Sequence, residues 1–119
     1  MKHRILIVED EPRIASFIEK GLRKNGFSTQ VVCDGEQALQ ATKFNAYDII
    51  LLDLLLPEKD GWTVLKELQQ EGCKSSVIVV TALDNTKQEI FAAGAQDAIQ
   101  KPFHFKDLLD AVNRQIEAE

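Results

Sequence analysis

The sequence predicts an α/β fold in which five parallel strands form one central sheet with helices on both faces. Two observations lead to this prediction. Five short segments of β type alternate with stretches that are long enough to form helices. Three of these segments are continuously apolar, which is typical of parallel strands buried on both faces. Because the chain has 119 residues, we expect one domain over residues 1–119.

Apolar periodicity and turn residues place the individual elements. Apolar residues recur at helical spacing over residues 14–22 and 105–116, and a third amphipathic stretch begins after Gly61. Residues 38–42 carry a weaker helical pattern, and a short helix over residues 86–93 would close at Gly94. The expected strands are residues 5–8, 29–32, 49–52, 77–80 and 97–100.

The composition excludes several classes of protein. With 19 acidic and 14 basic residues, the chain lacks the basic surface that binds nucleic-acid phosphates, so we expect this segment to bind no nucleic acid. Asp53 interrupts the longest apolar stretch, so no membrane span is expected. The apolar run near the N-terminus is too short for a secretory signal, and Cys33 and Cys73 lack metal-type spacing. We therefore expect a cytoplasmic protein with reduced thiols.

Polar side chains follow four of the five expected strands at the point where each strand ends. Glu9 and Asp10 follow the first strand, Asp53 follows the third, Thr81 the fourth and Lys101 the fifth. The carboxyl ends of parallel strands meet at one edge of a sheet, and ligands bind at this edge in open α/β folds. We therefore expect these side chains to lie together.

Three carboxylates at one sheet edge repel one another and need compensation. Capping of the following helix is an alternative role for Asp10 or Glu11. Asp53 has no such simple explanation, because an ionised group within an apolar stretch is costly unless it is compensated. Hard oxygen ligands from Glu9, Asp10 and Asp53 favour Mg²⁺, whereas proton uptake by one carboxyl group is the alternative.

Lys101 and Thr81 add a cation and a hydroxyl group to the same expected pocket. Alone, a threonine that ends a strand and a solvated lysine are both unremarkable. Together with a metal ion, these groups can stabilise a phosphoryl group during transfer. In that chemistry Asp53 would be the nucleophile.

Five motifs occur in chain order: residues 5–12 (ILIVEDEP), Asp53 with Leu56-Pro57 and Asp60-Gly61, Val79-Val80-Thr81-Ala82, Gly94-Ala95, and Lys101-Pro102-Phe103. Over residues 4–117 the chain thus resembles a bacterial two-component response-regulator receiver domain of the OmpR/PhoB type. The resemblance implies a flavodoxin-like (CheY-like), doubly wound sheet of strand order 2-1-3-4-5 with five helices.

The resemblance also implies a set of site roles. Asp53 would accept a phosphoryl group from a sensor histidine kinase. Asp10 and Asp53 would bind Mg²⁺ directly, Glu9 would act through metal-bound water, and the main-chain carbonyl of Leu55 would be the third protein ligand. Such a domain is a signalling switch and not an enzyme, and it would regulate transcription through a DNA-binding domain outside this chain.

Further implications concern the switch and its partners. Thr81 and Lys101 would contact the phosphoryl oxygens and repack an output surface, and the Lys101–Pro102 peptide bond would be cis. Ile14 and Phe17 have core-type spacing, but the resemblance favours kinase docking for them. A homodimer would use the face formed by the fourth helix, the fifth strand and the fifth helix.

Three features depart from the family pattern. Ala98 stands where the family usually has an aromatic residue, so the usual aromatic switch is missing at this position. The segment over residues 83–87 looks shortened. Leu55 and Leu83 are bulky and apolar at positions that flank the path of the hydrolytic water, so we expect them to prolong the life of the phosphorylated form.

Three other functions compete with this interpretation. A flavodoxin-like cofactor binder would need phosphate-binding donors where residues 9–11 are acidic. A phosphatase would need a second acid where residues 54–55 are leucines. A receiver-like interaction module that does not depend on phosphorylation stays open. Three further aromatic residues are expected to pack within the fold and not to form a ligand cage: Trp62, Phe44 and Phe91.

Overall fold

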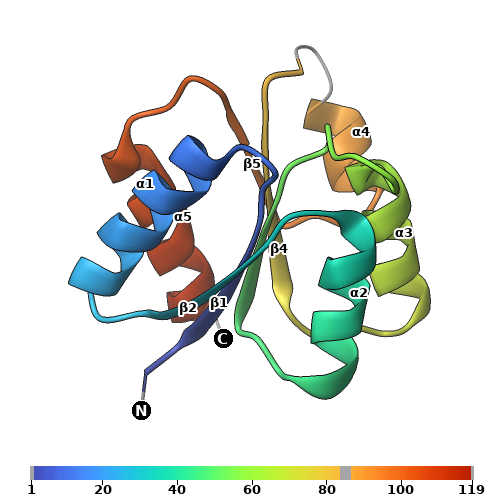
Figure 1. Ribbon diagram of the computed structural model, residues 1–119, viewed down its shortest axis with the longest axis horizontal. Coiled ribbons are helices and arrows are strands. Elements are labelled where there is room, and N and C mark those ends of the chain that lie inside the picture. The colour runs from blue at the N-terminus through green and yellow to red at the C-terminus, as the bar shows by residue number, and fades with distance from the viewer. Residues whose placement is uncertain (1, 84–86, 119) are drawn as a thin grey trace.

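The five strands form one parallel sheet of order β2-β1-β3-β4-β5, as predicted (Figure 1). The computed structural model describes residues 2–83 and 87–118. The strands differ from the expected segments by at most one residue at either end. They are β1 (Arg4–Val8), β2 (Ser28–Val32), β3 (Ile49–Leu52), β4 (Ser76–Thr81) and β5 (Asp97–Gln100).

The helices cover both faces of the sheet. Figure 1 shows α1 and α5 on one face and α2, α3 and α4 on the other. The weak pattern at residues 38–42 does form a helix, and residue 86 of the short expected helix lies outside the described residues. No described helix is both long and apolar enough to cross a membrane. The helices are α1 (Pro12–Lys24), α2 (Gly35–Phe44), α3 (Gly61–Gln70), α4 (Lys87–Ala92) and α5 (Phe105–Ala118).

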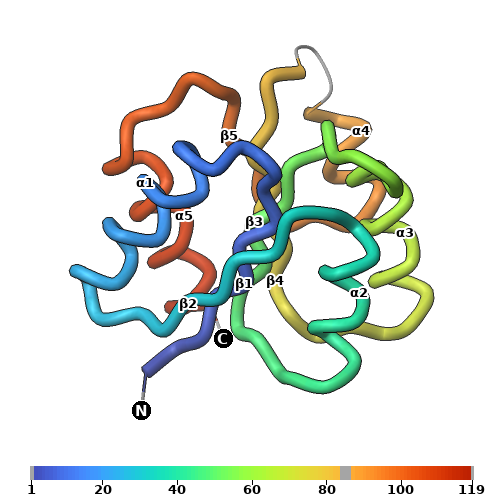
Figure 2. The backbone as a smooth tube through the Cα atoms, in the orientation of Figure 1, coloured from blue at the N-terminus to red at the C-terminus, as the bar shows by residue number. Residues whose placement is uncertain are grey.

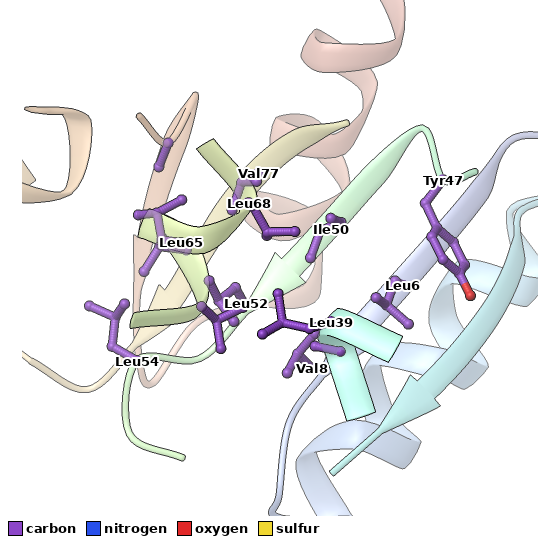
Figure 3. Close-up of a cluster of buried hydrophobic side chains, with 14 of the residues drawn as sticks. Leu6, Val8, Leu39, Tyr47, Ile50, Leu52, Leu54, Leu65, Leu68 and Val77 are labelled. Atoms are coloured by element: carbon purple, nitrogen blue, oxygen red, sulfur yellow. The ribbon is translucent and has the colours of Figure 1, made fainter. Parts of the chain in front are cut away.

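Each strand contributes to two separate apolar cores. Leu6 of β1 packs in the core beneath α2, α3 and α4, whereas Ile5 packs in the core beneath α1 and α5. Figure 3 shows the first of these cores, with Leu39 of α2 and Leu65 of α3 facing Leu52 of β3. Because alternate residues point to opposite faces, strands covered on both sides must be apolar throughout. This requirement explains the continuous apolar runs in the sequence.

The packing prediction for the aromatic residues is wrong for two of the three. Trp62 packs partly buried against the core. Phe44, the last residue of α2, is 78% exposed, and Phe91 is 44% exposed. On α4 the buried position belongs to Ile90, so the next residue along the helix points away from the sheet.

Candidate functional site

The candidate site lies where the strands end, at the upper edge of the sheet in Figure 2. Parallel hydrogen bonding continues beyond the strand ends and fixes the backbone there. The Asp53 N–H donates to the Val8 carbonyl at 3.1 Å, and the Lys101 N–H donates to the Thr81 carbonyl at 2.8 Å. The side chains that follow β1, β3 and β5 are therefore held in register with one another.

Three carboxylates meet at this edge. One oxygen from each of Glu9, Asp10 and Asp53 lies within 4.8 Å of the other two. Glu9 is 3% exposed and Asp53 is 5% exposed, whereas Asp10 faces solvent. An all-oxygen set that is open on one side fits a hard cation such as Mg²⁺, which keeps several water ligands.

The hydrogen bonds do not support the alternative role of Asp10 or Glu11 as a cap of α1. Glu11 occupies the N-cap position of α1, but its side chain makes no capping hydrogen bond. Its backbone N–H instead donates to Glu9 Oε2 at 3.1 Å. Asp10 is left with its carboxylate beside those of Glu9 and Asp53.

Lys101 reaches into the acidic cluster. Its Nζ lies 2.6 Å from Glu9 Oε1 and 3.0 Å from Asp53 Oδ2, and its side chain is 14% exposed. One ammonium therefore pairs with two of the three carboxylates, and the cluster keeps an excess of negative charge. The sequence predicted that Lys101 would share this pocket, but not that it would pair directly with Glu9.

Burial and pairing shift two pKa values in the site. Burial raises the pKa of Glu9 above its ordinary value of 4.5, although the Lys101 ammonium and the Glu11 N–H oppose this effect. Burial alone would lower the pKa of Lys101, but hydrogen bonds with Glu9 and Asp53 outweigh it and raise the pKa above 10.5. Lys101 thus holds its proton more firmly than a lysine in water.

The loop between β3 and α3 shapes the other side of the site. The Leu55 N–H donates to Asp53 Oδ1 at 3.1 Å, so it orients this carboxylate. The Gly61 N–H donates to the Leu54 carbonyl at 2.9 Å. A Cβ at Gly61 would lie 2.3 Å from the Asp53 carbonyl oxygen, so only glycine lets α3 start this close to the site.

The end of β4 and the neighbouring part of β5 form the remaining wall. Thr81 is buried, and its Oγ accepts a hydrogen bond from the Leu83 N–H at 3.3 Å. Ala98 lines a recess of about 300 Å³ together with Thr81 and Ile90. The Lys101–Pro102 bond is cis, as predicted. The shortened loop expected over residues 83–87 lies largely outside the described residues.

Comparisons with known proteins give the family. Residues 5–113 match the response regulator receiver domain. The chain belongs to this family. It is 36% identical to the transcriptional regulatory protein PcoR of Escherichia coli over 92% of its own length and 49% of that protein. It is also 37% identical to the chemotaxis protein CheY of Bacillus subtilis, over 98% of the chain and 99% of CheY.

Solved receiver domains share the fold. The Francisella response regulator 1452 receiver domain superposes with a TM-score of 0.95 at 34% identity and covers 98% of both chains. The receiver domain of the sensor histidine kinase PA1611 from Pseudomonas aeruginosa has a TM-score of 0.89 at 33% identity, over 98% of this chain and 99% of its own. That structure has a magnesium ion coordinated in its active site cleft. The chain spans about half the length of PcoR.

Proposed function

We propose that this receiver domain accepts a phosphoryl group on Asp53 from the phosphohistidine of a sensor histidine kinase. A carboxylate oxygen of Asp53 attacks phosphorus, and the bond between phosphorus and the imidazole nitrogen breaks. The imidazole takes up a proton as it leaves, and Asp53 becomes an acyl phosphate. The observation that carries this proposal is the convergence of three carboxylates and the Lys101 ammonium at one sheet edge.

Side chains around Asp53 prepare it for this reaction. The Leu55 N–H holds Oδ1, while Oδ2 faces the Lys101 ammonium. Lys101 would move from the carboxylates to the incoming phosphoryl oxygens, and the Thr81 hydroxyl would donate to another of these oxygens. Both groups then stabilise charge that develops during transfer.

The acidic cluster supplies the ligands for Mg²⁺. Asp10 and Asp53 would bind it directly, the Leu55 main-chain carbonyl would be the third protein ligand, and Glu9 would act through a metal-bound water. When bound, Mg²⁺ offsets negative charge between the carboxylates and the phosphoryl group. The fit rests on the oxygen-only donor set and on the open, solvent-facing side at Asp10.

Kinase docking is assigned to the face of α1 beside the site. Phe17 is 52% exposed, and together with Ile14 and Phe103 it lines an apolar groove of about 410 Å³ that extends to Lys101. A kinase that seats its helices on this groove would bring its phosphohistidine to Asp53. The mixed role expected for Ile14 and Phe17 fits this geometry, because Ile14 also packs against the core beneath α1 and Phe17 contacts the ring of Phe103.

Phosphorylation would change an output surface, which we assign to α4, β5 and α5. Similarity to the transcriptional regulatory protein PcoR supports transcription as the output. The domain would act in the cytoplasm, and a DNA-binding domain outside this chain would carry the output. A homodimer would form through the same face. Since Ala98 has no ring to rotate, movement of Thr81 would be relayed through the recess that Ala98 and Ile90 line.

The proposed acceptor is tested by phosphorylation with acetyl phosphate and Mg²⁺, followed by intact mass. The wild type gains the mass of one phosphoryl group, Asp53→Asn gains none, and Asp110→Asn on the exposed face of α5 behaves as the wild type. Failure of the wild type to gain mass would favour an interaction module that works without phosphorylation. Equal gain by Asp53→Asn would place the acceptor elsewhere.

A further inference from the structure

The loop between β3 and α3 contains a strained residue next to an unusual ion-pair junction. Among the residues that the structure describes, Glu58 is the only non-glycine residue with a positive φ, at 66°. The left-handed conformation is unfavourable for a residue with a Cβ, because the Cβ crowds the following carbonyl oxygen. Such a conformation persists only where the surroundings hold it in place. The next residue, Lys59, supplies contacts that do so.

Lys59 connects the loop to two helices. Its Nζ lies 2.9 Å from Glu36 Oε1 in the first turn of α2 and 3.1 Å from Glu67 Oε2 in α3. A second contact of 3.2 Å joins Nζ to Glu67 Oε1, so the Glu67 carboxylate is engaged at both oxygens. The Lys59 and Glu67 side chains are 25% and 33% exposed, whereas the Glu36 side chain is 62% exposed, so only the pair with Glu67 is partly shielded from solvent.

The backbone of Lys59 is held as closely as its side chain. A Cβ at Gly35 would lie 2.6 Å from the Lys59 carbonyl oxygen and 3.0 Å from the Lys59 Cβ. The first turn of α2 therefore packs directly on the loop. Backbone packing and two ion pairs together fix the position of Lys59 relative to α2 and α3.

This junction lies at the far end of the same short loop that begins at Asp53. Asp60 caps α3 by accepting from the Thr63 N–H at 2.9 Å, and the Gly61 N–H returns to the Leu54 carbonyl. The chain from Asp53 to Gly61 thus closes on itself. A displacement at Lys59 would be transmitted to Leu55, which orients the Asp53 carboxylate.

We propose that Lys59 is a positioning residue for the metal site, which it supports by clamping the loop between β3 and α3 onto Glu36 and Glu67. Within the described part of the chain, Lys59 forms ion pairs with these two acids and not with the carboxylate cluster, so it acts through the loop. The inference rests on the proposed function, because it assigns a role toward Mg²⁺ at that site.

If Lys59 acts only through its charge, its removal should raise the affinity for Mg²⁺, whereas if it positions the loop, its removal should lower that affinity. Deleting a positive charge near an acidic site strengthens cation binding if only long-range charge matters. Releasing the loop weakens cation binding, because groups that orient metal ligands commonly control affinity by tenfold or more. The direction of the change in Mg²⁺ affinity therefore separates the two effects.

The test compares Lys59→Met, Lys59→Arg and Lys106→Met by calorimetric titration with MgCl₂. Lys106 is the matched control, since it pairs with Asp110 on exposed α5 at 3.9 Å. We expect Lys59→Met to bind Mg²⁺ about threefold to tenfold more weakly, Lys59→Arg to stay within about twofold of the wild type, and Lys106→Met to match the wild type. Far-ultraviolet circular dichroism of each variant confirms folding before titration.

Unchanged or tighter Mg²⁺ binding by Lys59→Met overturns the inference, and so does equal weakening in Lys59→Arg or Lys106→Met. Phosphorylation of the wild type by acetyl phosphate is measured alongside. A wild type that binds Mg²⁺ and gains a phosphoryl group keeps the proposed function, whatever Lys59→Met does. A wild type that does neither removes the proposed function and this inference with it.

Discussion

Replacing Asp10 with asparagine should stabilise the metal-free protein and remove its response to Mg²⁺. Asp10 is the exposed member of a cluster whose carboxylate oxygens lie within 4.8 Å of one another. The substitution keeps the shape of the side chain and deletes its charge. It therefore isolates the electrostatic cost of bringing three acids together.

The size of the effect follows from Coulomb's law. Two unit charges 4.8 Å apart repel by about 0.9 kcal/mol in water and by about 3.5 kcal/mol at an effective dielectric constant of about 20. The Lys101 ammonium offsets about one of the two charges on Glu9 and Asp53. Because Asp10 faces solvent, the value for water applies more closely. We therefore expect Asp10→Asn to raise the free energy of unfolding by about 1 kcal/mol.

Urea unfolding followed by circular dichroism measures this gain. In EDTA, Asp10→Asn should unfold at higher urea than the wild type. Mg²⁺ at about ten times its Kd should stabilise the wild type by about 1.4 kcal/mol and Asp10→Asn by much less. Asp110→Asn on α5 is the control and should keep the full Mg²⁺ response. A less stable Asp10→Asn in EDTA, or one that keeps the wild-type response to Mg²⁺, would refute the reasoning.

Four other substitutions test three separate parts of the account. Gly61→Ala places a Cβ 2.3 Å from the Asp53 carbonyl oxygen, so the free energy of unfolding should fall by about 1–3 kcal/mol, and an unchanged urea midpoint would contradict the packing argument. Leu55→Asn and Leu83→Glu should shorten the life of the phosphorylated form, measured by intact mass over time; equal lifetimes would remove the proposed hindrance to water. Lys101→Met should lower the free energy of unfolding by about 2 kcal/mol near pH 8, because Glu9 and Asp53 lose their buried counter-ion. Since the pKa of Glu9 is raised above 4.5, protonated Glu9 favours the folded state, and this deficit should shrink as the pH falls through the acid range in which Glu9 takes up its proton; a deficit that is independent of pH would count against this pairing.

The fold was predictable because its three central strands, β1, β3 and β4, are buried on both faces. Residues 49–52 can satisfy such a position only if all are apolar, and β3 has these bounds in the structure. The same pattern also predicted where the strands end, since Asp53 interrupts an apolar run at the end of β3. Position in the sheet then brought Glu9, Asp53 and Lys101 together, as the family resemblance implied.

Other features depend on contacts that sequence periodicity does not encode. Phe44 is of a residue type that usually packs in a core, but it is the last residue of α2 and is exposed. Lys59 reads as an ordinary solvated lysine, because its partners Glu36 and Glu67 lie in two other elements. The pairing of Lys101 with Glu9 likewise spans most of the chain. These contacts follow from packing of helices and loops, which the order of residues alone does not show.

The most direct test of the account is whether phosphoryl transfer to Asp53 requires a divalent cation. Wild-type protein is incubated with acetyl phosphate in MgCl₂ or in EDTA, and intact mass is recorded at matched times. The account predicts the mass of one phosphoryl group in MgCl₂ and the unmodified mass in EDTA. Equal modification under both conditions would contradict the claim that the carboxylate cluster works by holding a metal ion.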